Sequence, residues 1–197
     1  RDPEMSRGLG DVYKRQLKDD DVLVLAGSIP SGMPQSIYRD IMSRLQSKRI
    51  KIAVDATKDL LMNVLAYHPF VIKPNNHELS EIFDIMIDSK EKAVVYAKEL
   101  QKRGAQNVIV SMAGEGAVFV GSDGSVFTSE APHGVVKNSV GAGDSMVAGF
   151  LAGYLAKGDY AEAFKMGLCT GSASAFSDQL ATREEVEQVR RSHIFDF

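Results

Sequence analysis

The sequence predicts an α/β domain with a mostly parallel β-sheet. Three short apolar runs, at 22–26, 52–54 and 70–73, have the length of strands, and the first is continuous, as expected for a strand covered on both faces. Between these runs, apolar residues recur at helical spacing. Strands that alternate with helices in such short units need crossover connections, and these connections produce parallel strands.

The helices of the first half follow from turn residues and apolar spacing. After a turn at 27–32, Pro34 suits the first position of a helix. The buried face of this helix is predicted to consist of Ile37, Ile41 and Leu45. A second helix is predicted around 60–65, and two more over roughly 76–85 and 89–103.

In the second half, a further strand at 107–111 is followed by a predicted β-hairpin over 116–128. Apolar residues after Gly143 then indicate a long helix, which Gly158 ends. Two local patterns predict the starts of the last helices. They are Asp159 with Glu162, and a capping box formed by Thr182 and Glu185.

Composition sets bounds on the class of protein. A chain of 197 residues with 44% hydrophobic and 25% charged residues suits one globular domain rather than a disordered segment. The net charge of −3 argues against non-specific binding to nucleic acid or to anionic membranes. The longest apolar stretch, 145–156, is too short to cross a bilayer. Cys169 is the only cysteine, so no intrachain disulfide can form, and we expect a cytoplasmic protein.

Residues 1–16 are mixed in charge and follow no regular period. We interpret them as a non-native or disordered tail and leave them out of the fold prediction. An ordinary polar helix or loop is the alternative. The predicted domain covers 17–197.

Residues 140–149, Val-Gly-Ala-Gly-Asp-Ser-Met-Val-Ala-Gly, are the strongest candidate for a site of chemistry. Gly141 and Gly143 let the backbone turn tightly where a helix begins. The first N–H groups of that helix, from Ala142 to Asp144, are then free to bind an anion. A carboxylate beside an anion site, here that of Asp144, repels the anion, so its presence needs a reason. Taking a proton from the group that attacks the anion would be such a reason. A cradle for charge beside a base is what phosphoryl transfer requires.

Residues 138–150 also resemble the C-terminal signature of the ribokinase-like sugar kinases, in the form carried by bacterial 1-phosphofructokinases. The resemblance implies a three-layer αβα domain with a mostly parallel sheet and a β-hairpin. It implies that Asp144 is the base that deprotonates a sugar hydroxyl. The anion hole would be formed by Gly141, Ala142 and Gly143. The alternative is a glycine-rich helix start that only packs closely.

Lys73-Pro-Asn-Asn-His-Glu78 follows directly on a predicted strand, where open α/β sheets bind their ligands. Asn75 and Glu78 can point the same way from the first turn of a helix, and such oxygen ligands suit Mg²⁺, directly or through water. The motif resembles the N-x-x-E element with which these kinases organise Mg²⁺ and phosphate, and Lys73 could reach a nucleotide phosphate. Alternatively, Asn75 caps the helix and Glu78 favours its positive end.

Ser111-Met-Ala-Gly-Glu-Gly116 resembles the Ser-Leu-Gly-x-x-Gly nucleotide loop of the family, with Met-Ala in place of Leu-Gly. A plain entry into a hairpin is the alternative. The ATP-binding residues implied by the resemblance are Lys73, Asn75, Ser111, Met112, Ala113, Gly114, Glu115, Gly116 and Gly143.

Two weaker signals complete the set of candidates. Gly27-Ser28-Ile-Pro30 resembles a Gly-Ser-Leu-Pro turn whose serine lies on the sugar side, so Ser28 joins Asp144 as a candidate substrate residue. The small residues of 171–177 resemble the wall that the family builds for adenine. A structural turn and close helix packing are the respective alternatives.

The resemblance implies an ATP- and Mg²⁺-dependent kinase that converts fructose 1-phosphate to fructose 1,6-bisphosphate. A tagatose-6-phosphate kinase and a non-catalytic nucleotide-binding remnant remain open. Family members carry a long N-terminal part before the Gly-Ser-Leu-Pro turn, with further strands, a Gly-Gly-Lys-Gly-x-Asn motif and a β lid, none of which this sequence has. We therefore expect a fragment with an exposed sheet edge that tends to associate. The resemblance also implies a homodimer for the full-length form, because family members often pair through that lid.

Overall fold

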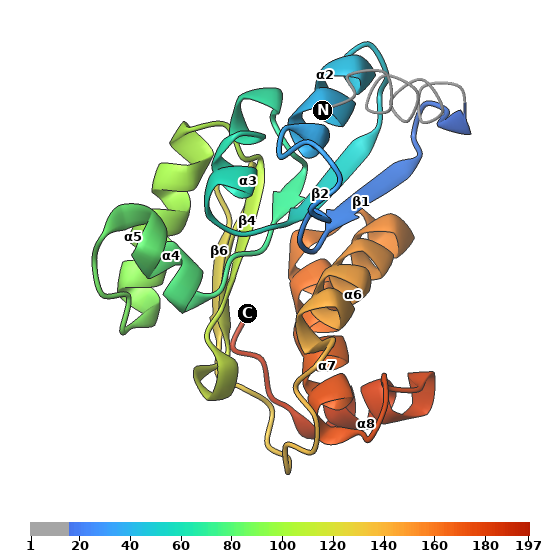
Figure 1. Cartoon of the computed structure of the whole chain (residues 1–197). Coiled ribbons are helices and arrows are strands. Elements are labelled where there is room, and N and C mark those ends of the chain that lie inside the picture. Colours follow the sequence, from blue (N-terminus) through green and yellow to red (C-terminus); the bar gives the residue numbers. More distant parts are fainter. Residues whose placement is uncertain (1–15) are drawn as a thin grey trace.

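The computed structural model describes residues 16–197, so the predicted tail lies outside the described residues except for Gln16. A six-stranded sheet runs through the centre of the molecule with its strands in sequence order (Figure 1). The first four strands are parallel, and the last two continue the sheet as an antiparallel hairpin. The strands are β1 (Val22–Ala26), β2 (Lys51–Asp55), β3 (Val71–Ile72), β4 (Asn107–Ser111), β5 (Ala117–Val120) and β6 (Val126–Ser129).

Helices cover both faces of the sheet, which confirms the predicted three-layer α/β fold (Figure 1). One face carries α2 (Ile37–Leu45), α3 (Lys58–Met62), α4 (Asn76–Phe83) and α5 (Lys90–Lys102). The other face carries α6 (Ala142–Lys157) and α7 (Tyr160–Phe176), and α8 (Arg183–Ser192) packs against α7. Among the described residues, none of these helices is long and apolar enough to cross a membrane.

The alternation of strand side chains supplies two separate cores. In β2, Val54 packs into the core beneath α2–α5, whereas its neighbour Ala53 packs into the core beneath α6 and α7. Ile72 and Val71 divide between the two cores in the same way. Successive side chains of a strand point to opposite faces, so short apolar runs suffice to bury both sides of the sheet.

Glycines let α6 and α7 pack closely. A Cβ at Gly149 would lie 2.5 Å from the Thr170 hydroxyl and 2.8 Å from the Met166 carbonyl oxygen. Gly153 faces the α7 backbone at Ala163 in the same way, with 2.9 Å from a Cβ to Cα. Small residues at this spacing allow the two helices to approach, and the end of α7 is thereby held beside the start of α6.

Three expectations for the first half were wrong. β1 is not covered on both faces, because Val24 is 46% exposed whereas its neighbour Leu25 is buried. Pro34 does not begin a helix. It lies in a turn in which its carbonyl oxygen accepts the N–H of Ile37, and α2 starts only at Ile37. The helix expected around 60–65 ends at Met62, and a separate 3₁₀ turn follows at Leu65–Tyr67.

Candidate active site

The first group of candidate residues lies at the carboxyl ends of three neighbouring parallel strands. Val54 of β2 pairs with Ile72 of β3, so the residues that follow, Asp55 and Lys73, come out side by side. Two residues beyond Lys73, Asn75 forms a parallel bridge with Ser111 at the end of β4. Ligands of open parallel sheets bind at the carboxyl ends of the strands. The sequence predicted that Lys73 and Asn75 would lie there.

The start of α4 is fixed by a reciprocal capping box. The Asn75 side-chain oxygen accepts the Glu78 N–H at 2.8 Å, and Glu78 Oε2 accepts the Asn75 N–H at 2.8 Å. The capping role considered as an alternative for this motif is therefore present. Glu78 keeps its second carboxylate oxygen, for which the described residues offer no hydrogen-bond donor.

The start of α6 departs in one respect from the predicted anion hole. Gly141 takes a left-handed conformation (φ 79°), which a glycine adopts without strain, and precedes the first helical turn. The Ala142 N–H, one of the three predicted donors, already donates to the Ser139 carbonyl at 3.2 Å. Within residues 16–197, the Gly143 N–H has no recorded acceptor, so it remains available to an anion. The Ala142 N–H was expected to be free because it belongs to the first turn of a helix, but the tight turn at 139–142 gives it an acceptor.

A buried ion pair lies directly beneath this turn. Lys73 Nζ is 3.3 Å from Asp55 Oδ2, and the two side chains are 7% and 18% exposed. A Cβ at Gly143 would lie 3.1 Å from Lys73 Nζ. Burial raises the pKa of the Asp55 carboxyl above its ordinary value, Lys73 opposes this, and the charge of Asp144 adds to it. Asp144, which is exposed in the first turn of α6, therefore lies within electrostatic reach of these strand ends.

Asp55 is a candidate residue that sequence reasoning missed. The signal was present, because an acidic residue ends a buried strand next to the strand that ends at Lys73. Only the register of β2 against β3 shows that the two charges meet.

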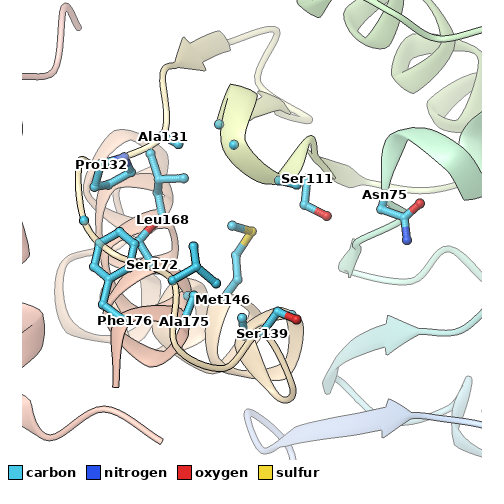
Figure 2. Close-up of a pocket in the computed structure, with 18 of the residues that line it drawn as sticks. Asn75, Ser111, Ala131, Pro132, Ser139, Met146, Leu168, Ser172, Ala175 and Phe176 are labelled. Atoms are coloured by element: carbon cyan, nitrogen blue, oxygen red, sulfur yellow. The ribbon is translucent and has the colours of Figure 1, made fainter. Parts of the chain in front are cut away.

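A pocket of about 650 Å³ opens between the end of the sheet, α6 and α7 (Figure 2). Figure 2 shows Asn75 and Ser111 on one side of it, with Pro132, Leu168 and Phe176 opposite. The predicted residues that line it are Asn75, Ser111, Ala113, Gly114, Gly116, Ala142 and Gly143.

The remaining predicted residues do not line this pocket. Met112 is buried in the core beneath α2–α5, and Glu115 is exposed within the 111–116 loop. Lys73 lies beneath Gly143 rather than at the surface of the pocket. Ser28 is separate from all of these, since it follows the edge strand β1 and borders a small apolar hollow with Ile29 and Met33.

The apolar wall of the pocket comes largely from residues that the sequence did not single out. A segment after β6, which includes Ala131, Pro132 and Gly134, faces Leu168 and Phe176 of α7. The stretch 171–177, predicted as a weak adenine wall, does contribute, through Gly171, Ser172, Ala175 and Phe176. A ligand with a flat ring and an anionic group fits this shape, because the apolar wall ends at the free N–H of the α6 turn. Among residues 16–197, no three His, Cys, Asp or Glu side chains gather closely enough to hold a metal.

Comparisons with known proteins agree on one family. Residues 6–185 match the pfkB family carbohydrate kinase. A 1-phosphofructokinase from Bacillus subtilis (strain 168) is 44% identical over 175 residues, which are 89% of this chain and 57% of that protein. A D-tagatose-1-phosphate kinase from Bacillus licheniformis is 30% identical over 88% of this chain and 57% of its own length.

The solved structures give the same result for the fold. Phosphofructokinase-2 from Escherichia coli, crystallised in complex with substrates and products, superposes with a TM-score of 0.86 at 26% identity. The match covers 96% of this chain and 62% of that structure. This chain thus spans less than two thirds of the length of these relatives. Because the family match extends over most of the sequence, the chain belongs to the pfkB family of carbohydrate kinases.

Proposed function

We propose that this chain supplies the ATP site and the catalytic base of a sugar-phosphate kinase that converts fructose 1-phosphate to fructose 1,6-bisphosphate. The observation that carries the proposal is the position of one exposed carboxylate. Asp144 stands in the first turn of α6, next to Gly143, which lines the large pocket. The 44% identity to a 1-phosphofructokinase supports the choice of sugar.

In this proposal the nucleotide lies along the pocket. Its base packs against the apolar wall around Leu168 and Phe176, and its phosphates run past the 111–116 loop toward α6. The Gly143 N–H stabilises charge on the transferred phosphoryl group, and Gly141 supplies the left-handed turn that exposes it. Ala142 contributes backbone shape rather than a donor, since its N–H is already bonded.

Asp144 is proposed to take the proton of the attacking sugar hydroxyl, here the 6-hydroxyl of fructose 1-phosphate. Its carboxylate is exposed and lies outside the pocket lining, where a second substrate could approach. In phosphoryl transfer, most of the acceleration comes from positioning and electrostatics, so a single well-placed base and one anion site are the parts to expect.

Mg²⁺ is proposed to be held by Glu78, with Asn75 as its second residue. The free carboxylate oxygen of Glu78 fits such an ion, which usually keeps several waters and touches few protein groups. Asn75 locks that carboxylate in place through the capping box, and its own oxygen keeps one lone pair for water. When bound, the metal neutralises charge on the phosphates of ATP.

The identity of the sugar is the finer part of the proposal. Ser28 is the proposed sugar contact, although it lies outside the large pocket, and the wider sugar site would need residues beyond this chain. A tagatose phosphate is the competing substrate. The 30% identity to a D-tagatose-1-phosphate kinase favours the 1-phosphate over the 6-phosphate. The proposed compartment is the cytoplasm, and the proposed full-length form is a homodimer.

A second candidate function is nucleotide binding without catalysis. It is favoured by the fact that Asp144, the proposed base, does not line the pocket. In that case the pocket would bind ATP, and no sugar would accelerate release of ADP.

Two measurements on the whole chain separate these readings. The first is ATP binding by calorimetry, which both candidates require. The second is coupled ADP release with fructose 1-phosphate, tagatose 1-phosphate, tagatose 6-phosphate or no sugar. The kinase proposal expects the largest stimulation with fructose 1-phosphate. Binding of ATP without any sugar-dependent release supports the second candidate, and no binding of ATP rejects both.

A further inference from the structure

The ion pair between Asp55 and Lys73 is buried at the point where the pocket meets α6. Asp55 ends β2 and Lys73 follows β3, and their side-chain atoms Oδ2 and Nζ are 3.3 Å apart. Taking two charges out of water is costly, and replacing such a pair by apolar residues is often neutral or stabilising. Stability alone is therefore a weak reason for the pair to be here.

The orientation of the pair relative to Gly143 is specific. A Cβ placed on Gly143 would lie 3.1 Å from Lys73 Nζ and 3.9 Å from Asp55 Oδ2. The ammonium is thus the nearer of the two charges, and the positive end of the pair faces the first turn of α6. The Gly143 backbone separates Lys73 from the pocket, because Gly143 lines the pocket and Lys73 does not.

The lack of a side chain at position 143 leaves room for this approach. Any side chain there would press on the end of Lys73, which is 6% exposed and has little room to move aside. The absence of a side chain therefore lets a positive charge lie close to the Gly143 backbone. A fixed charge in a buried setting is screened less than one on a solvated lysine.

We propose that Asp55 is a positioning residue, which holds the Lys73 ammonium beneath Gly143 so that its charge adds to that of the α6 N-terminus at the nucleotide phosphates. The inference rests on the proposed function, since it assumes that ATP phosphates bind at that turn. Asp55 touches no ligand itself and acts through Lys73. Among residues 16–197, Asp55 is the ion-pair partner of Lys73, so without its carboxylate no described residue directs the flexible lysine side chain at this turn.

The test compares two ligands that differ only in phosphates. Binding of ATP and of adenosine, at constant MgCl₂, is measured by calorimetry for the full chain and for Asp55→Ala, Lys73→Met and the double variant. Adenosine reports folding and the base site, so the ratio of the ATP and adenosine affinities isolates the phosphate contribution. We expect Asp55→Ala and Lys73→Met each to lower this ratio by about tenfold, the usual effect of one charge-assisted contact. The double variant should be no worse than Lys73→Met alone.

Asp55→Asn keeps the shape and an acceptor oxygen but removes the charge, so its ratio should lie between those of the unsubstituted chain and Asp55→Ala. If Asp55→Ala misfolds and does not bind adenosine, Asp55→Asn serves as the test of the inference instead. An unchanged ratio in Asp55→Asn would mean that the carboxylate does not position Lys73. A higher ratio would mean that the carboxylate mainly repels the phosphates. Either result overturns the inference. Additive losses in the double variant, or equal losses of ATP and adenosine, overturn it too. Failure of the unsubstituted chain to bind ATP would instead reject the proposed function.

Discussion

Gly134 lies so close to Phe176 that a Cβ at position 134 would come within 2.4 Å of the aromatic ring. Both residues line the large pocket, one from the segment after β6 and the other from the end of α7. The missing side chain at 134 lets an irregular segment rest on a ring, and this contact closes the apolar wall of the pocket.

The first prediction concerns this contact. Gly134→Ala should push the Phe176 ring or the 130–135 segment out of place, because the pair has no spare room. We expect ATP affinity to fall by roughly tenfold, with a loss in the free energy of unfolding of about 1 kcal/mol, the low end for overpacking, since Gly134 is exposed. Calorimetric binding and urea unfolding measure the two effects.

Gly32→Ala is the matched control, because an added Cβ there meets nothing within 4 Å and the residue lies outside the pocket. Both quantities should stay unchanged in that variant. Undiminished ATP affinity in Gly134→Ala would show that the contact with Phe176 does not shape the ligand site.

The second prediction concerns the contact between α6 and α7. A methyl group at Gly149 would meet the Thr170 hydroxyl at 2.5 Å and the Met166 carbonyl at 2.8 Å. We expect Gly149→Ala to lower the free energy of unfolding by about 1–3 kcal/mol through overpacking. This loss occurs even though alanine favours a helix over glycine by about 1 kcal/mol.

The neighbouring exposed position gives the control for that prediction. Ala148→Gly should cost about 1 kcal/mol from helix propensity alone. Urea unfolding of both variants and of the unsubstituted chain measures the difference. If Gly149→Ala stabilises the chain, the two helices are farther apart than described.

The third prediction concerns acid stability. Glu162 Oε2 lies 2.7 Å from Lys157 Nζ and 2.7 Å from Arg190 Nη2, which joins α7 to α8. Hydrogen bonds from Lys157 and Arg190 lower the pKa of Glu162 from 4.5 to about 2. The folded pKa lies below the unfolded one, so the ionised group stabilises the fold above about pH 4.5, and this stabilisation is lost as pH falls toward 2. Allowing for solvent screening, we expect about 1 kcal/mol.

Chemical unfolding at pH 7, 4 and 3 checks this window. Glu162→Gln should be less stable than the unsubstituted chain at pH 7, and the difference should shrink as the pH falls. Glu184→Gln is the control, because Glu184 also lies in the first turn of a helix but has no ion pair among the described residues. A difference for Glu162→Gln that does not depend on pH would contradict the depressed pKa.

Local signals in the sequence predicted local structure well. The Thr182–Glu185 capping box, the Asp159 cap and the hairpin after β4 each depend on residues a few positions apart, and all three are present. The capping role of Asn75 follows the same logic. Such interactions lie within one turn or one hairpin, so the residue types and their spacing contain the information needed.

The errors and omissions lie where partners come from distant segments. The apolar run of β1 looks like that of a strand covered on both faces, and only the packing of distant segments decides that Val24 stays exposed. The pairing of Asp55 with Lys73 depends on strand register, and the donation from Ala142 to Ser139 depends on how the preceding loop approaches α6. Residues of the apolar pocket wall, such as Pro132, have no distinctive chemistry, so no motif could identify them.

The last prediction concerns the proposed base. Asp144→Asn keeps the size of the side chain but cannot take a proton, so sugar-dependent ADP release should fall by about 10²–10⁴-fold. ATP affinity should stay the same or rise slightly, because the substitution removes a negative charge beside the phosphate site. Asp59→Asn, which changes an exposed first-turn residue of α3, should alter neither quantity. A parallel loss of ATP affinity and turnover in Asp144→Asn would indicate a role in binding or folding. Near-normal turnover would show that the sugar hydroxyl attacks without the Asp144 carboxylate. Its proton would then leave by another route, and Asp144 would not be the base.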